Sequence, residues 1–233
     1  MTLDGRVAVV TGGTGALGQA VTRRLLAAGA AVVVPYLREG AGEALAARLE
    51  PAERARLVLA RADVTDDAAM QALAASARAR HGRIDILVAL VGGFAPGRLV
   101  ETDRATWERM LALNLTSLFV AARAVVPHLV EAGGGRVVTV SSRAILPPGA
   151  GFIAYATAKA GVVAFTQALA QELRPAGVTV NCVLPSTMDT PANRAAMPQA
   201  DRRAWVPVES VAEAIAFLVS DAARHVTGAL VAV

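Results

Sequence analysis

Short apolar runs rich in β-branched residues alternate along the chain with alanine- and leucine-rich stretches of helical period. Runs of the first kind predict strands at Arg6–Val10, Ala31–Val34, Leu57–Ala60, Ile84–Val91, Arg136–Val140, Val178–Val183 and Ala229–Val233. Helices are predicted between them at Leu17–Ala28, Gly42–Leu49, Asp66–His81, Asp103–Ala132, Ala154–Leu173 and Val208–Ser220. Because strands joined by crossover helices are parallel and buried on both faces, the alternation predicts an α/β fold with a doubly wound parallel sheet.

Composition narrows the class of protein. The pattern is even from end to end, which indicates one domain over residues 1–233, and 55% hydrophobic residues exclude a disordered chain. A net charge of +4 does not indicate nucleic-acid binding, because the arginines are scattered and only 4% of residues are aromatic. The single cysteine, Cys182, cannot form an internal disulfide and favours a reduced, cytoplasmic protein. No apolar run approaches the ~20 residues of a membrane helix, and the histidines lack metal-ligand spacing, so neither a membrane nor a metal is expected.

Glycines gather between the first predicted strand and the first predicted helix, in Thr11-Gly12-Gly13-Thr14-Gly15-Ala16-Leu17-Gly18. A glycine-rich turn at this place lets the backbone approach a pyrophosphate, and the following helix supplies N–H groups and the positive end of its dipole. The pattern predicts a dinucleotide held by Gly12, Thr14, Gly15, Leu17 and Gly18. A tight strand-to-helix turn without a ligand has the same pattern.

The segments after the second and third strands bear on the choice of cofactor. Pro35-Tyr36-Leu37-Arg38 has no carboxylate to repel a 2′-phosphate, and Arg38 is suited to pair with one. This favours NADP(H) over NAD(H), although Arg38 beside Glu39 also fits a plain surface arginine. Asp63 and Val64 follow the third strand, a position from which they could reach the adenine edge of a cofactor. The alternative is that Asp63 forms a turn or caps a helix.

Tyr155 and Lys159 are the strongest candidates for chemistry. Residues i and i+4 share one face of a helix, so the Lys159 ammonium is expected to lower the pKa of the Tyr155 phenol from about 10. Lys159 is the single lysine among 23 basic residues, and the other 22 are arginines. Lysine carries a compact ammonium, so the use of lysine at this one position suggests that the chemistry of the site requires it. The alternative is a Tyr–Lys pair on a solvated helix face.

Together these motifs resemble the short-chain dehydrogenase/reductase family over essentially the full length of the chain. In that family a serine stands 13 residues before the tyrosine, as Ser142 does here, and an asparagine of the fourth helix completes the set, as Asn114 does. The resemblance implies a Rossmann-type fold of about seven strands and an NAD(P)-dependent enzyme that interconverts a small carbonyl compound and an alcohol.

The resemblance also implies roles for the four residues. Tyr155 is expected to be the general acid/base, Ser142 to hold the substrate oxygen, and Lys159 to stabilise the tyrosinate and contact the nicotinamide ribose. Asn114 is expected to position a water that links Lys159 to solvent. Two plainer interpretations stay open: Ser142 as a strand-ending serine, and Asn114 as a helix-interior residue bonded to a backbone carbonyl.

Other family motifs match in part. In Pro185-Ser186-Thr187-Met188-Asp189-Thr190, Ser186 replaces a glycine, and the resemblance places Pro185, Met188 and Thr190 beside the nicotinamide. Ala16 stands at the second glycine of the family turn. The family's Asn-Asn-Ala-Gly appears as Ala89-Leu90-Val91-Gly92, so only Gly92 carries over as a cofactor neighbour. The family commonly forms dimers or tetramers through its two long apolar helices, so a homo-oligomer, specifically a homotetramer, is expected.

The pocket loops resemble dihydropteridine reductase, a divergent member of the family, at Gly92–Ala95 and from Leu184 to Trp205. This makes a pterin-type reductase one alternative, although Ser142 departs from that enzyme, which relies on the Tyr–Lys pair without the serine. A non-catalytic NAD(P)-binding regulator is another. Candidates for an apolar substrate pocket are Phe94, Ile145, Leu146, Phe152, Met188, Met197 and Trp205, each of which also fits core or lid packing.

Overall fold

The computed structural model describes residues 2–233 and contains a seven-stranded parallel sheet with the strand order β3-β2-β1-β4-β5-β6-β9. The strands are β1 (Val7–Thr11), β2 (Ala31–Tyr36), β3 (Leu57–Arg61), β4 (Ile86–Ala89), β5 (Gly135–Val140), β6 (Val178–Leu184) and β9 (Leu230–Ala232). Two short strands, β7 (Met188–Asp189) and β8 (Val206–Pro207), pair separately. The predicted Rossmann-type architecture is therefore confirmed.

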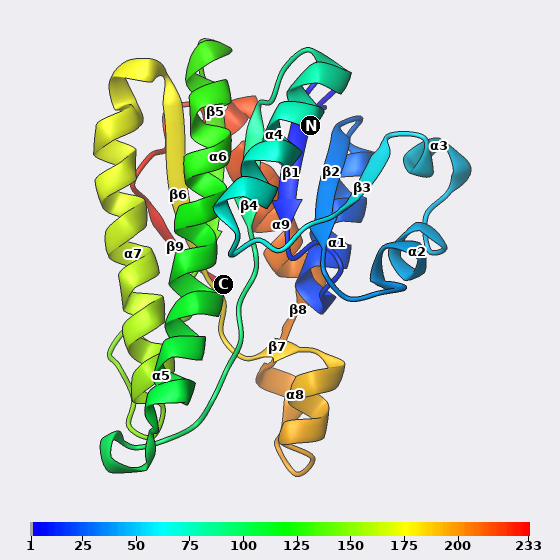
Figure 1. Cartoon of the computed structure of the whole chain (residues 1–233). Coiled ribbons are helices and arrows are strands. Elements are labelled where there is room, and N and C mark those ends of the chain that lie inside the picture. The colour runs from blue at the N-terminus through cyan, green and yellow to red at the C-terminus, as the bar shows by residue number, and fades with distance from the viewer. Residues whose placement is uncertain (1) are drawn as a thin grey trace.

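Helices cover both faces of the sheet (Figure 1). They are α1 (Ala16–Ala27), α2 (Ala41–Ala46), α3 (Pro51–Arg54), α4 (Asp67–His81), α5 (Arg104–Leu111), α6 (Ser117–Glu131), α7 (Ile153–Leu173), α8 (Pro191–Ala196) and α9 (Val208–Val219). A turn of π-helix, Ala112–Thr116, joins α5 to α6. The long helix predicted at Asp103–Ala132 is therefore continuous, with a local change of pitch in its middle.

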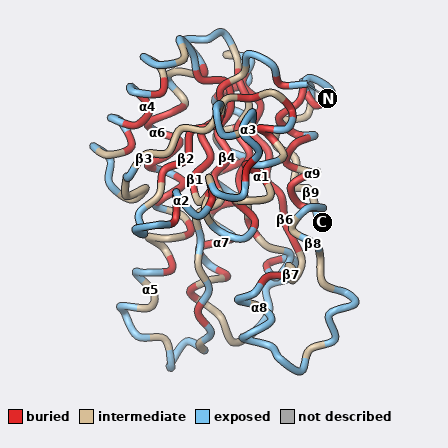
Figure 2. Tube along the Cα trace, turned by 90° about the vertical axis from the view of Figure 1, so that its right-hand side faces the viewer, coloured by how far each residue is buried: buried red, intermediate tan, exposed pale blue. Residues whose placement is uncertain are grey.

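Two apolar layers follow from the alternation of side chains along each strand. Ala8 and Val10 of β1 belong to the layer under α1 and α9, whereas Val7 and Val9 belong to the layer under α4, α6 and α7. Strands that face helices on both sides are apolar along most of their length. All five residues of β1 are buried, and only the last of them, Thr11, is polar. Figure 2 shows the buried strands as the centre of the molecule.

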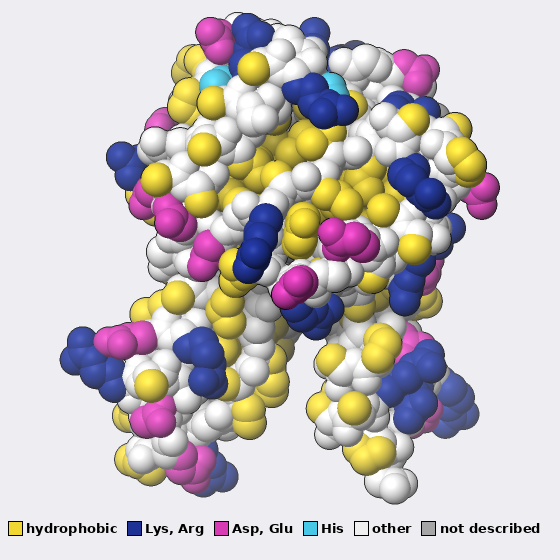
Figure 3. All heavy atoms as spheres, turned by 45° about the vertical axis from the view of Figure 1, so that its right-hand side comes forward, with side chains coloured by type: hydrophobic (Ala, Val, Ile, Leu, Met, Phe, Trp, Pro, Cys, Tyr) yellow, Lys and Arg dark blue, Asp and Glu magenta, His cyan; other side chains and the backbone are white. Residues whose placement is uncertain are grey.

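The carboxyl ends of the strands open onto a cleft. Parts of the chain around α5 and α8 project beyond this edge of the sheet (Figure 1), and Figure 3 shows the surface hollowed between the two projections. The strand order reverses between β1 and β4, which is where open α/β sheets bind ligands. At this point the Leu90 amide donates to the Thr11 carbonyl at 3.1 Å.

Several elements differ from the sequence predictions. β4 is confined to Ile86–Ala89, shorter than the predicted Ile84–Val91, because the apolar residues beyond Ala89 leave the sheet to pass over the glycine turn. The short elements α3, α8, β7 and β8 were not predicted, since two to six residues carry too little periodicity.

Two helical stretches, Arg104–Glu131 and Ile153–Ala176, are long and apolar enough to cross a membrane by length and composition alone. Both lie against the sheet: α6 contacts β4 and β5, and α7 contacts β5 and β6. Apolar helices in this position form part of a protein core, so they are weak evidence for a membrane span.

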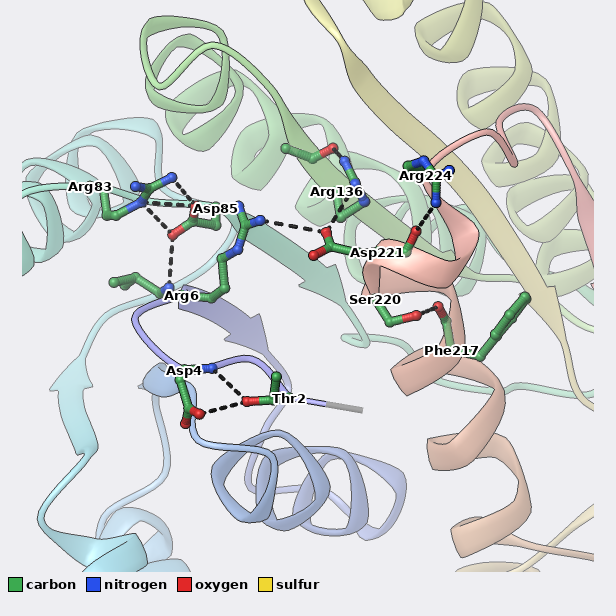
Figure 4. A network of polar contacts seen from close by, with 12 residues as sticks. Thr2, Asp4, Arg6, Arg83, Asp85, Arg136, Phe217, Ser220, Asp221 and Arg224 are labelled. Atoms are coloured by element: carbon green, nitrogen blue, oxygen red, sulfur yellow. Dashed lines mark hydrogen bonds and ion pairs between the residues drawn. The ribbon is translucent and has the colours of Figure 1, made fainter.

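A buried carboxylate ties the amino ends of the strands together (Figure 4). Asp85 is 1% exposed and accepts hydrogen bonds from the Val7 backbone at 2.9 Å, from Arg6 at 3.1 Å and from Arg83. Arg6 also reaches Asp221, at 3.5 Å, in the turn after α9. The network holds β1, β4 and the end of α9 together at the edge of the sheet that is opposite to the cleft.

Asp85→Ala is expected to lower the free energy of unfolding by about 2–4 kcal/mol, because it leaves the buried Val7 N–H without an acceptor and breaks a pairing to a buried charge. Urea denaturation of the variant provides the measurement. Asp201→Ala, which removes an exposed ion pair with Arg203, is the matched control and should leave the urea midpoint unchanged. Equal midpoints for the wild type and Asp85→Ala would contradict the structural role of Asp85.

Candidate active site

Backbone atoms pack closely against the glycines of the turn between β1 and α1. Gly12 has φ +70°, and a Cβ added there would lie 2.9 Å from the Val91 nitrogen; one added at Gly18 would lie 2.0 Å from the Gly12 oxygen. No side chain caps α1, and its first turn holds no acidic residue. The unpaired N–H groups of this helix end therefore suit a pyrophosphate. Ala16 is exposed at the first helical position, which explains how a methyl group is tolerated where the family motif has glycine.

The residues predicted for the adenosine end lie at the ends of β2 and β3. Arg38 is exposed in the loop after β2, and its guanidinium has no hydrogen-bond or ion-pair partner within residues 2–233. One Asp63 oxygen accepts from the Thr65 amide at 2.9 Å and from the Thr65 hydroxyl at 2.7 Å, and these bonds lower the pKa of Asp63. Asp63 thus forms the turn that the sequence left open, while Val64 packs against the apolar layer under α4.

Lys159 is anchored at both of its ends, to Val140 at the end of β5 and to Ser141, the next residue. Its ammonium Nζ donates to the Val140 carbonyl at 2.9 Å, and its own backbone carbonyl accepts from the Ser141 hydroxyl at 2.8 Å. The residue is only 7% exposed, and burial lowers the pKa of Lys159 to about 8. The solvated-face interpretation of Lys159 is therefore wrong.

Tyr155 lies one helical turn before Lys159, and the lysine Nζ is 6.0 Å from the centre of its ring. Burial raises the pKa of the Tyr155 phenol, and the nearby Ser142 hydroxyl offsets part of that effect. The expectation that Lys159 lowers the pKa of Tyr155 is therefore not met in the protein alone. Loss of solvation is the main cause of the raised pKa, and the Lys159 ammonium is directed to the Val140 carbonyl.

Ser142 begins the loop after β5, and the neighbouring strand fixes its place. Its Oγ accepts from the Ala144 amide at 3.1 Å, while the Arg143 amide donates to the Pro185 carbonyl at 3.0 Å. The ends of β5 and β6 are thereby joined. The structure brings the Ser142 hydroxyl to the Tyr155 phenol, as the spacing of 13 residues suggested.

Asn114 points inward from the π-helical turn and clamps the loop after β4. Its Nδ2 donates to the Gly93 carbonyl and to the Met110 carbonyl, each at 3.0 Å, and its Oδ1 accepts from the Gly93 amide at 3.2 Å. The bonding to backbone carbonyls that the sequence left open is thus present. A Cβ on Gly92 would lie 2.8 Å from Asn114 Oδ1 and 3.3 Å from Lys159 Nζ, so Gly92 separates the two polar groups and no larger residue fits there.

The segment after β6 completes the edge of the cleft. The Thr190 hydroxyl accepts from the Asn193 amide at 3.2 Å and so caps α8, which leaves its hydrogen free to donate. The Met188 carbonyl accepts from Asn193 Nδ2 at 2.8 Å. Pro185, Met188 and Thr190 therefore lie on one segment whose shape is held by its own hydrogen bonds.

The structure places the predicted pocket residues in different surroundings, and Met188 packs against the apolar layer under α1 and α9. Phe94 and Phe152 lie against Tyr155, Ile145 is buried, and Leu146 and Met197 are exposed. The Arg202 guanidinium lies over Trp205, 5.8 Å from the centre of the tryptophan ring. Sequence reasoning missed Ser141, whose hydroxyl holds the Lys159 backbone; its only signal is a second serine at the end of the strand.

Comparison with known proteins agrees with this arrangement. The family model for short chain dehydrogenase matches residues 6–201. The chain belongs to the short-chain dehydrogenase family. It is 40% identical to cis-4-hydroxycyclohexanecarboxylate dehydrogenase of Sinomonas cyclohexanicum over 98% of this chain and 94% of that protein. It is 31% identical to the 3-oxoacyl-[acyl-carrier-protein] reductase FabG of Escherichia coli over 98% and 95% of the two chains.

A solved structure supports the same assignment. A short-chain dehydrogenase/reductase from Burkholderia xenovorans superposes with a TM-score of 0.89 at 34% identity, covering 99% of this chain and 95% of that chain. The short-chain dehydrogenase described here is thus an NAD(P)-dependent oxidoreductase that interconverts a carbonyl and an alcohol.

The burial of Lys159 predicts a particular dependence of stability on pH. The pKa of Lys159 falls from 10.5 to about 8 on folding, so between these values the folded protein has released a proton that the unfolded chain retains. Stability then rises with pH in that window. Relative to Lys159→Met, which cannot titrate, the wild type should gain about 3 kcal/mol of unfolding free energy across it.

Urea denaturation of both proteins at a series of pH values on either side of pH 8 measures this gain. Below that pH the difference between the proteins should be constant, because the lysine is protonated in both states. A difference that is also constant above pH 8 would show that Lys159 is not desolvated.

Proposed function

We propose that Tyr155 exchanges the proton in this reaction. The observation that carries the proposal is the position of its phenol near Ser142, one helical turn from the buried Lys159 and at the same sheet edge as the glycine turn. During reduction the Tyr155 hydroxyl gives its proton to the carbonyl oxygen, and during oxidation the phenolate takes one from the alcohol. Ser142 donates a hydrogen bond to the same substrate oxygen.

Lys159 and Asn114 support the proton exchange. A bound nicotinamide cofactor supplies or accepts the hydride and, when oxidised, brings a positive charge to the site. Lys159 binds the ribose hydroxyls through Nζ and stabilises the tyrosinate when Tyr155 has given up its proton. A planar guanidinium would fill this double task poorly, which accounts for the one lysine of the chain. Asn114 holds the loop beside Lys159 and positions a water between the ammonium and solvent.

The cofactor is proposed to lie along the carboxyl edge from the glycine turn to α8. Arg38 pairs with the 2′-phosphate, so that NADP(H) is favoured over NAD(H). The remaining contacts are proposed for Gly12, Thr14, Gly15, Leu17, Gly18, Asp63, Val64, Gly92, Tyr155, Lys159, Pro185, Met188 and Thr190.

The domain organisation, location, partners and oligomeric state are proposed from membership of the same family. We propose one domain over residues 1–233, a cytoplasmic location, a small-molecule substrate with no nucleic-acid or membrane partner, and a homotetramer assembled through the α5–α6 and α7 helices. Exposed apolar side chains on these helices, such as Phe119 and Val130, support an interface there. The names of the relatives offer two substrate chemistries, a ring alcohol and an open-chain 3-oxoacyl group.

Tyr155→Phe should lower kcat/KM by about 10²–10⁴-fold, because it removes the exchangeable proton and keeps the ring. NADPH oxidation with a panel of ketones, quinones and a quinonoid pterin measures turnover, and quenching of protein fluorescence measures NADPH binding. The dissociation constant for NADPH should stay within about threefold of the wild-type value.

Tyr36→Phe removes the only other phenol of the chain, at the end of β2, and serves as the control that keeps its turnover. A Tyr155→Phe variant with wild-type turnover would refute the assignment of Tyr155. Binding of NADPH by the wild type without oxidation by any compound of the panel would contradict the proposed chemistry.

Arg38→Ala should weaken NADPH binding by about tenfold or more and change NADH binding by less than about threefold, since only NADPH carries the 2′-phosphate. Fluorescence titration with each nucleotide measures both constants. Arg174→Ala, an exposed arginine after α7, controls for the loss of one positive charge. Equal losses for the two nucleotides would contradict the pairing of Arg38 with the 2′-phosphate, and no loss for either would show that Arg38 is a plain surface arginine.

A further inference from the structure

Phe94 is 62% exposed, yet the backbone on either side of it is fixed. Asn114 holds Gly93, the preceding residue, through both its amide and its carbonyl. Three residues later the Gly97 amide donates to the Gly151 carbonyl at 2.7 Å, and the Gly97 carbonyl accepts from the Ile153 amide at 3.2 Å. A large apolar ring held in water by a fixed loop has the character of a binding surface.

The same two backbone bonds place Phe152, which lies between Gly151 and Ile153, beside Phe94. The two ring centres are 6.1 Å apart. Phe152 also lies over a glycine: a Cβ added at Gly149 would be 2.8 Å from the tip of its ring. The position of Phe152 thus depends on the absence of a side chain at residue 149.

Both phenylalanines meet the phenol that exchanges the proton. Phe94 contacts Tyr155 with ring centres 5.1 Å apart and Phe152 with ring centres 6.2 Å apart, each with an angle of 73° between the ring planes. Trp107 packs in the same cluster as Tyr155. Four of the nine aromatic residues of the chain therefore gather at this point, although aromatic residues make up only 4% of it.

We infer that Phe94 and Phe152 form an aromatic cradle that selects a cyclic ketone, or the corresponding ring alcohol, over an open-chain one. The inference rests on the proposed role of Tyr155, because the substrate oxygen must reach its phenol. A rigid ring covers the exposed Phe94 surface with little loss of conformational freedom, whereas a flexible chain must be ordered to make the same contacts. The C–H edges of the substrate ring complement the electron-rich aromatic faces.

Reduction of cyclohexanone and of 2-hexanone, two ketones of equal carbon number, tests the cradle. The wild type should prefer cyclohexanone in kcat/KM by about tenfold or more. Phe94→Ala should lower kcat/KM for cyclohexanone by about 10–100-fold and for 2-hexanone by less than about threefold, so that the preference disappears. Phe152→Leu should reduce the preference in the same direction, and Phe94→Tyr, which keeps the flat ring, should retain it.

Phe217→Ala is the matched control, because it removes an exposed phenylalanine from α9, near the amino ends of the strands, and should change neither rate. Binding of cyclohexanol, followed by saturation-transfer NMR, gives a readout without turnover. Its signal should be strong for the wild type and Phe217→Ala and weak for Phe94→Ala.

Two sets of results would overturn the inference while the proposed function stands: a wild type that turns over both ketones without preference, and a Phe94→Ala variant that loses both rates equally. Cyclohexanol that binds through Phe94 in a wild type that reduces neither ketone would instead contradict the proposed function, and it would leave the cradle supported by the NMR signal alone.

Discussion

Burial of one ammonium group is the constraint on which the site depends. Lys159 loses solvation when α7 packs against the sheet, and the Val140 carbonyl replaces part of the lost water. The Ser141 hydroxyl fixes the lysine backbone, and Ser142, the next residue, supplies the hydroxyl that meets Tyr155. Three consecutive residues at the end of one strand thus set the lysine head, the helix register and the serine. The relative positions of Ser142, Tyr155 and Lys159 follow from docking one helix on one strand.

Gly92 and Gly93 connect the buried lysine with the loop after β4, the strand next to β5. A glycine at position 92 leaves room for the Asn114 and Lys159 side chains, and Gly93 supplies two of the three backbone groups that bond Asn114. The π-helical turn directs Asn114 at this loop, in keeping with the frequent occurrence of such turns at functional sites. The ends of β4 and β5 are therefore coupled through side chains of α7 and of the α5–α6 segment. A larger residue at position 92 would displace the lysine and the asparagine together.

The sequence predicted the strands, the main helices and the catalytic candidates, because these depend on period and spacing. The β-branched runs and the step of four residues from Tyr155 to Lys159 are local properties that tertiary contacts did not override. The end of β4 and the role of Ser141 could not be predicted in this way, since each depends on contact with a segment distant in sequence. The pKa of Tyr155 was expected to fall, but burial, which periodicity does not quantify, raises it.

The raised pKa of Tyr155 connects this residue with the aromatic surface formed by Phe94 and Phe152. Phe94 and Phe152 lie against the phenol whose pKa is raised by loss of solvent, so the apolar rings that would hold a substrate also form part of the surroundings of Tyr155. A protonated phenol is a proton donor, which suits reduction of a carbonyl. Removal of that proton leaves a phenolate in apolar surroundings, and Lys159, 6.0 Å from the ring centre, is the buried cation on the same helix. The raised pKa of Tyr155, the aromatic surface beside it and the single buried lysine are therefore parts of one site.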